Sequence, residues 1–292
     1  MRQKNILYNI NMVWVVVFMM SMMTAATVMA QKDQKTLTIL HTNDTHSCIM
    51  PLNPNLADTV VAGRGGYLRR IAMLKEERAK CPDLLLFDSG DFSQGSSYYT
   101  TFRGDVEVGL MNQMRYDAVT IGNHEFDFGL DNMIRLFKMA NFPIVCSNYD
   151  FADTELARIV KPYIILHRRG LKIGVFALCP ELEGLVTSQN YGPLRYLDPT
   201  KCAQQMVDQL KAQKCDLIIC LSHLGWQTST HPCDRVIRET RGIDLVLDGH
   251  THTYLKQLEY VNDLDGRPVA VDQNGKHAVF VGKLQLQFDK RK

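Results

Sequence analysis

The chain alternates short apolar runs with longer segments in which apolar residues recur with helical spacing. The short runs predict buried strands, and the spaced pattern predicts amphipathic helices. Strands alternating with helices predict an α/β fold. The expected strands are residues 37–40, 84–87, 118–121, 144–146, 173–178, 217–221 and 245–247, and the expected helices are residues 67–79, 106–115, 130–140, 200–212 and 234–240.

The later part of the chain predicts additional strands. Arg168-Arg169-Gly170 lies between two apolar runs and indicates a hairpin, so a mixed sheet is expected. After His252 the helical pattern stops, and residues 269–271, 278–281 and 284–288 are expected to be strands. No Pro-, Gly- or Ser-rich linker interrupts the pattern. We therefore expect one domain over residues 35–292.

Residues 1–30 have the composition of a secretory signal peptide. Arg2 and Lys4 precede an apolar stretch, residues 12–30, which ends at the small residue Ala30 before a polar segment. An uncleaved membrane anchor is the alternative, because the stretch is close to the ~20 residues that span a bilayer. Hydroxyl side chains within the stretch weaken that alternative. We expect a cleaved signal and a periplasmic or secreted protein, with no other membrane segment.

Composition argues against several classes of protein. The formal net charge is +2, so no strong positive field indicates a nucleic-acid partner. The eight cysteines are scattered and form no C-x-x-C pair, which argues against a zinc ribbon. Cys146, Cys179 and Cys220 lie in apolar runs and are expected to be small buried hydrophobic residues.

Five expected strands are each followed by carboxylate, amide or imidazole side chains. Open α/β sheets bind ligands at the carboxyl ends of their strands, so polar residues repeated at that place predict one shared site. The segments are His41-Thr42-Asn43-Asp44-Thr45-His46, Asp88-Ser89-Gly90-Asp91, Gly122-Asn123-His124-Glu125-Phe126-Asp127, Ser222-His223 and Asp248-Gly249-His250-Thr251-His252.

These residue types suit a metal cluster, because Asp, Asn and His supply oxygen and nitrogen ligands without thiolate. In an extended segment, alternate residues point to the same side. Asp44 with His46, and His250 with His252, are therefore each expected to face one ion. Each motif alone has an ordinary structural explanation, such as a buried core histidine at His223. Their joint occurrence at successive strand ends favours the metal site.

The chain resembles the calcineurin-like metallophosphoesterases in the order of five motifs, which are D-x-H, GD, GNHE, a single H and GHxH. The family often has a second Asp after Gly90-Asp91, which is missing here. That form resembles the 5'-nucleotidase branch, as do the segments at residues 40–46, 65–69 and 123–129. The similarity extends over residues 36–289. It implies a four-layer αββα sandwich with two mixed β-sheets between helices.

The resemblance also implies a role for each residue of the site. A hydroxide bridging two divalent ions, Zn, Mn or similar, would attack phosphorus, and protonated His124 would assist the leaving group. Asp127 lies about one helical turn beyond His124 and could orient its ring; a first-turn acid stabilised by the helix dipole is the alternative. One ion would be held by Asp44, His46, Asp91 and His252. The other ion would be held by Asp91, Asn123, His223 and His250. The phosphate would be bound by Asn123 and His124.

The implied activity is hydrolysis of phosphate monoesters by an exported enzyme, with nucleotides as the expected substrates. A 2',3'-cyclic-nucleotide phosphodiesterase, a thiosulfate-ester hydrolase on the same metal core, and a non-catalytic metal-binding subunit are the alternatives. Intact His124 and Asp127 argue against the last. The family's C-terminal nucleotide-specificity domain has no counterpart before Lys292, so we expect a separate partner chain that resembles it.

Overall fold

The computed structural model describes residues 35–288, and the predicted signal peptide, residues 1–30, lies outside this range. Two sheets carry most of the strands. One has the order β12 (Gly282–Phe288), β1 (Lys35–Thr42), β2 (Leu85–Asp88) and β3 (Ala118–Val119). The other has the order β10 (Glu259–Asn262), β11 (Pro268–Asp272), β9 (Leu245–Leu247), β8 (Leu217–Ser222), β6 (Leu171–Leu178) and β5 (Tyr163–Arg168). β4 (Tyr149–Asp150) and β7 (Arg195–Tyr196) form a short antiparallel pair.

The helices lie between these strands in the sequence. They are α2 (Tyr67–Lys80), α3 (Ser97–Phe102), α4 (Asp105–Met114), α5 (Gly129–Met139), α6 (Ser188–Tyr191), α7 (Pro199–Ala212) and α8 (Cys233–Arg238), with 3₁₀ turns η1 (His124–Phe126) and η2 (Glu155–Arg158). Within residues 35–288, no helix combines the length and apolar character that a membrane span requires.

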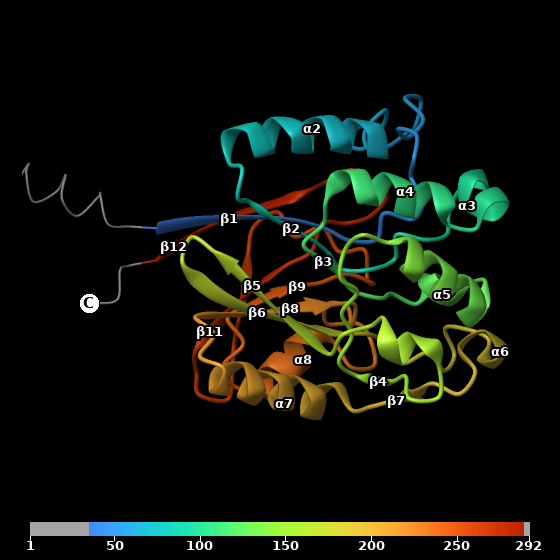
Figure 1. The fold of residues 1–292 in the computed structure, drawn as a ribbon. Coiled ribbons are helices and arrows are strands. Elements are labelled where there is room, and N and C mark those ends of the chain that lie inside the picture. Colours follow the sequence, from blue (N-terminus) through green and yellow to red (C-terminus); the bar gives the residue numbers. More distant parts are fainter. Residues whose placement is uncertain (1–34, 289–292) are drawn as a thin grey trace, which may run out of the picture. The chain divides into compact units, whose positions relative to one another are not determined.

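Residues 38–284 form one compact unit, and residues 35–37 and 285–288 belong to a second, terminal unit. Within residues 38–284 the two sheets lie between helices, with α2 and α4 on one side and α7 and α8 on the other (Figure 1). Strands β6, β8, β9 and β11 run parallel, whereas β5 and β10 are antiparallel edge strands. The predicted α/β fold with helices outside mixed sheets is therefore confirmed.

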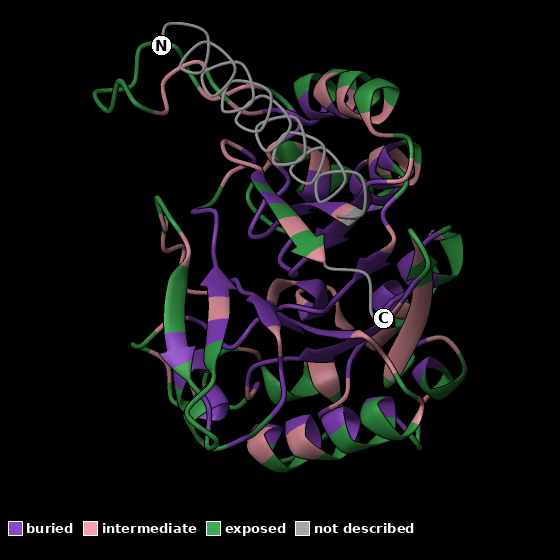
Figure 2. Cartoon of the chain, turned by 90° about the vertical axis from the view of Figure 1, so that its left-hand side faces the viewer, coloured by how far each residue is buried: buried purple, intermediate pink, exposed green. Residues whose placement is uncertain are grey.

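Burial explains why the central strands have continuous apolar sequences. Strand β8 is buried at every position, since helices cover one face of its sheet and the other sheet covers the opposite face. Helix α7 buries Ala203, Val207 and Leu210 against that sheet and exposes its polar residues. Figure 2 shows buried residues along the strands and exposed residues on the outer faces of the helices.

Two of the expected strands are wrong. Residues 144–146 form only single bridges, at Ile144 and Val145, and the run is apolar because it packs into the core rather than because it pairs along its length. Residues 278–281 are not a strand, because His277 and Ala278 adopt positive φ angles of 61° and 59° that bend the chain. Strand β3 also ends at Val119, two residues earlier than expected.

The hairpin expected at Arg168-Arg169-Gly170 is confirmed, with Arg168 of β5 paired to Leu171 of β6. Cys146, Cys179 and Cys220 are buried as expected. All eight cysteines are free thiols in the structure.

Candidate metal centre

The predicted site residues lie in five loops that follow β1, β2, β3, β8 and β9. In each loop the chain leaves the carboxyl end of a strand, and these ends meet where the two sheets face each other. The structure brings together Asp44, His46, Asp91, His124, His223, His250 and His252 in three overlapping groups, with Asn123 beside His250 and Asp127 beside His124.

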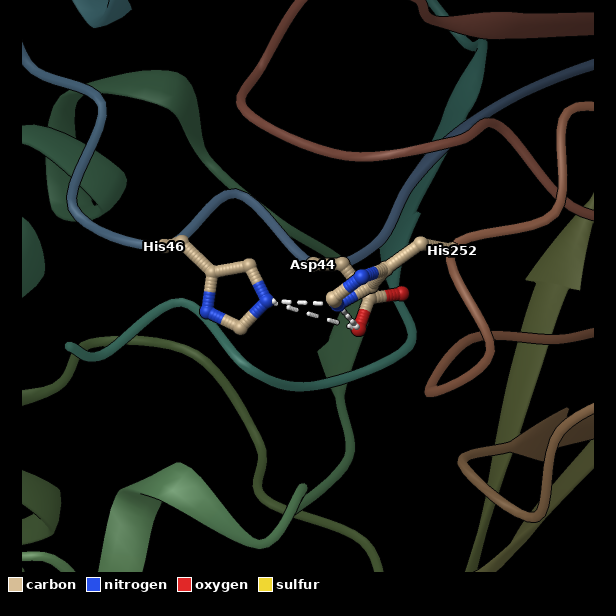
Figure 3. Close-up of side chains that lie close together, drawn as sticks. All are labelled: Asp44, His46 and His252. Atoms are coloured by element: carbon tan, nitrogen blue, oxygen red, sulfur yellow. Dashed lines mark hydrogen bonds and ion pairs between the residues drawn. The ribbon is translucent and has the colours of Figure 1, made fainter. Parts of the chain in front are cut away.

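The first group contains Asp44, His46 and His252 (Figure 3). The Nε2 atoms of His46 and His252 lie 2.9 Å apart. Asp44 Oδ1 is 3.5 Å from His252 Nε2 and 3.9 Å from His46 Nε2. Three potential ligand atoms from two distant loops therefore converge on one point.

The second group contains Asp91, His223 and His250, and Asp91 also belongs to a third group with His46 and His124. Asp91 Oδ2 is 3.1 Å from His223 Nε2 and 4.0 Å from His46 Nε2. One carboxylate thus stands between the histidines of both sides. That is the position a bridging ligand would need.

The expectation that D-x-H and H-x-H lie in extended segments is wrong. Asp44, His46, His250 and His252 have positive φ angles of 47°, 43°, 74° and 56°. These are left-handed conformations, which non-glycine residues adopt at a cost and which cluster at functional sites. As a result His250 and His252 do not face the same point: His252 joins Asp44 and His46, whereas His250 joins Asp91 and His223.

Most of the imidazoles in the site are neutral at neutral pH. Burial lowers the pKa of His46 to about 3 and the pKa values of His250 and His252 to about 4. A neutral imidazole keeps one nitrogen lone pair for a metal ion. His223 Nδ1 donates to the carbonyl oxygen of Ser89 at 2.5 Å, which leaves Nε2 directed at the cluster.

The electrostatics of the cluster suit an added cation. Asp44 and Asp91 are almost completely buried, and no Lys or Arg within residues 35–288 forms an ion pair with either. Burial raises the pKa of Asp44. Burial opposes the charge on His223, but the Asp91 carboxylate outweighs that effect and raises its pKa. A bound divalent ion would oppose both shifts, because it favours the deprotonated form of its ligands.

An unpaired nitrogen atom and tight backbone packing give independent support for a metal site. His46 Nδ1 is buried without a hydrogen-bond partner in the described part of the chain, and His223 Nε2 has the Asp91 carboxylate, at 3.1 Å, as its neighbour. A Cβ atom on Gly122 would lie 2.1 Å from Asp91 Oδ1, so only glycine allows that carboxylate its position. The donor set, buried imidazole nitrogen and carboxylate oxygen, fits divalent ions of the Zn or Mn kind.

Glu125 is a site residue to which the sequence pattern assigned no role, although it lies inside the GNHE motif. Its buried carboxylate accepts hydrogen bonds from the backbone nitrogens of Asp91 at 3.0 Å, Ser93 at 3.1 Å and Gly122 at 2.6 Å. It therefore ties the loop after β2 to the loop after β3. The acidic residue in the motif was the available signal, but its backbone partners are set by the fold.

We expect Glu125→Ala to lower the free energy of unfolding by about 3–5 kcal/mol, because three buried N–H groups lose their acceptor. Urea titration of the metal-free protein measures this directly. Glu259→Ala, which changes an exposed residue of β10, is the control and should have little effect. A loss below about 1 kcal/mol in Glu125→Ala would show that the two loops are held together without it.

His124 lies at the edge of the cluster and contacts both a candidate ligand and a second acid. Its backbone nitrogen donates to Asp91 Oδ1 at 2.9 Å, and its Nδ1 lies 3.1 Å from Asp127 Oδ2. Burial lowers the pKa of His124, but the hydrogen bond to Asp127 and the charge of Asp91 outweigh burial and raise it. The side chain is about one-third exposed, so a ligand can reach the ring.

Comparison with known proteins agrees with this geometry. Residues 37–254 match the calcineurin-like phosphoesterase family. Human 5'-nucleotidase is 32% identical over 87% of this chain and 47% of its own length. The crystal structure of a 5'-nucleotidase precursor from Thermus thermophilus superposes with a TM-score of 0.79 at 30% identity, covering 87% of this chain and 52% of that one.

A second solved structure, the NAD nucleotidase of Haemophilus influenzae, has a TM-score of 0.76 at 26% identity and covers 88% of this chain and 48% of that one. The chain thus spans about half the length of the curated relatives it matches. The family match covers most of the chain and includes all nine predicted site residues. The chain belongs to the calcineurin-like phosphoesterase family.

Proposed function

We propose that the chain is an exported, metal-dependent phosphomonoesterase that hydrolyses nucleotides. The observation that carries this proposal is that Asp91 stands between two groups of imidazoles, with the His124–Asp127 pair at the open edge. The similarity to nucleotidases supports the substrate class. The composition of residues 1–30 supports export.

In this proposal two divalent ions are bound. Such ions would polarise the phosphoryl oxygens and lower the pKa of a bound water at neutral pH. The neutral state of His46, His250 and His252 supports this assignment, because protonated imidazoles would repel cations. One ion would be held by Asp44, His46, Asp91 and His252. The other ion would be held by Asp91, Asn123, His223 and His250.

His124 and Asn123 contact the phosphoryl group in this proposal. His124 carries a proton more readily than an ordinary histidine, and Nδ1 is occupied by Asp127. Its remaining ring nitrogen can therefore donate a proton to the departing oxygen or stabilise charge on the phosphoryl group. Asp127 is a positioning residue, since its carboxylate contacts the ring of His124. Asn123 Oδ1 lies 3.0 Å from His250 Nδ1, which places the amide beside the cluster.

The test is an assay of the purified chain with AMP, a 2',3'-cyclic nucleotide, thiosulfate esters and an aryl phosphate. We expect hydrolysis of AMP and the aryl phosphate, loss of both activities after chelation, and recovery with Mn²⁺ or Zn²⁺. Elemental analysis before and after chelation is the control. Full activity in protein shown to be metal-free would contradict the proposal, and exclusive hydrolysis of the cyclic or thiosulfate ester would identify a different hydrolase.

A further inference from the structure

A cavity of about 320 Å³ opens beside the candidate metal centre. Candidate ligand His250 forms part of its wall, so a molecule in the cavity would lie next to the cluster. The remaining wall comes from the loop after β6, residues 180–185, the loop after β8, residues 224–231, and Tyr196 of β7. It is therefore built at the same carboxyl ends of the strands as the site itself.

The permanently charged side chains of this cavity have one sign, and His231 and His250 are its imidazoles. Glu181 and Glu183 lie in its wall, and no ion pair within residues 35–288 includes either of them. No Lys or Arg within residues 35–288 lines the cavity. A second anionic group on a bound molecule would therefore meet two uncompensated carboxylates, whereas a cationic group would be attracted.

The rest of the wall offers both apolar contact and hydrogen bonds. Pro180, Leu185 and Leu224 give it apolar surface, and three hydroxyl residues lie at positions 228–230. Tyr196 Oη is buried without a hydrogen-bond partner in the described chain. Burial and the nearby Glu181 carboxylate raise the pKa of Tyr196, so its hydroxyl stays protonated.

We propose that this acidic cavity receives the alcohol part of the phosphate ester and selects neutral or cationic leaving groups against anionic ones. The inference rests on the proposed function, because it assigns the leaving-group side of the same site. The expected substrates are monoesters whose only anionic group is the phosphoryl group, such as a nucleoside monophosphate. Esters that carry a further phosphate or a carboxylate are poor substrates.

Three aryl phosphates test the inference: 3-(aminomethyl)phenyl, 3-ethylphenyl and 3-(carboxymethyl)phenyl phosphate. The methylene group blocks resonance with the ring, and measuring the same three esters with Glu181→Gln/Glu183→Gln corrects for the remaining inductive difference between the phenols. We expect kcat/KM to fall in that order, with about tenfold between the cationic and the anionic ester. Glu181 and Glu183 are partly exposed, so each is expected to contribute about as much as a surface ion pair. Together they would change kcat/KM by about tenfold.

The double variant Glu181→Gln/Glu183→Gln should reduce that ratio to about two. Glu76→Gln/Glu259→Gln, which removes the same charge from exposed positions outside the cavity, should leave it unchanged. High salt should also reduce the ratio in the unmodified chain. An equal kcat/KM for the three esters, or a ratio that persists in Glu181→Gln/Glu183→Gln, would overturn the inference.

Binding of the product phenols separates this inference from the proposed function. Saturation-transfer NMR with 3-(aminomethyl)phenol and 3-(carboxymethyl)phenol needs no turnover. We expect the first to bind more tightly and to lose that advantage in Glu181→Gln/Glu183→Gln. If no ester is hydrolysed, the proposed function is wrong, and equal binding of the two phenols would then overturn the cavity assignment as well.

Discussion

Asp91→Ala is expected to lower kcat/KM by at least ~10³-fold and to reduce the bound metal, because metal-ion catalysis contributes several kcal/mol and each ~1.4 kcal/mol is a factor of ten. Asp91 and His46 each belong to two of the three ligand groups, and Asp91 is the carboxylate of the two. It also accepts a hydrogen bond from the backbone nitrogen of His124. Its removal therefore affects both candidate ion positions and the placement of the catalytic histidine.

Loss of folding must be separated from loss of metal in this variant. In the metal-free protein the Asp91 charge repels the buried carboxylates of Asp44 and Glu125 and attracts His223, so its removal relieves repulsion while it also removes one favourable interaction. We expect Asp91→Ala to remain folded by circular dichroism. Asp91→Asn keeps an oxygen for the His124 backbone and should still lose metal. Asp153→Ala, at an exposed loop position, is the control. Retention of two equivalents of metal in Asp91→Ala would show that Asp91 is not the shared ligand.

His124→Ala is expected to keep its metal and to lose turnover by ~10²–10⁴-fold, the range for removal of a positioned proton donor. The competing interpretation is ligation, since His124 forms one of the three groups with His46 and Asp91. Metal content distinguishes the two, because a lost ligand lowers metal affinity and a lost proton donor does not. Equal loss of metal in His124→Ala and Asp91→Ala would contradict the catalytic role.

Leaving-group dependence gives His124 a second test. A proton donor matters most when the departing oxygen is strongly basic, so His124→Ala should affect an alkyl phosphate far more than 4-nitrophenyl phosphate. Asp127→Asn should show a smaller change with the same dependence, because Asp127 acts through the ring at 3.1 Å. A loss that is uniform across esters would assign His124 to phosphate binding alone.

The fold class followed from local signals. Apolar periodicity is a property of neighbouring residues, and the strands at β6, β8 and β9 and the helices at α2, α5 and α7 lie close to their expected bounds. The two incorrect strands, residues 144–146 and 278–281, show the limit of that signal. An apolar run reports burial, and burial does not require a continuous ladder of hydrogen bonds.

The residues of the site could be predicted from the sequence alone. They follow successive strands, and the carboxyl ends of strands lie on one side of an α/β sheet. Their grouping was decided by the tertiary structure. The left-handed backbone at His250 and His252 directs their imidazoles into different ligand groups. Alternation of side chains along an extended strand predicted that both would face one ion. Likewise, Glu125 joins two loops, and Glu181 and Glu183 share a cavity with His250, only because distant parts of the chain pack together. Such contacts depend on long-range packing, which spacing along the chain does not encode.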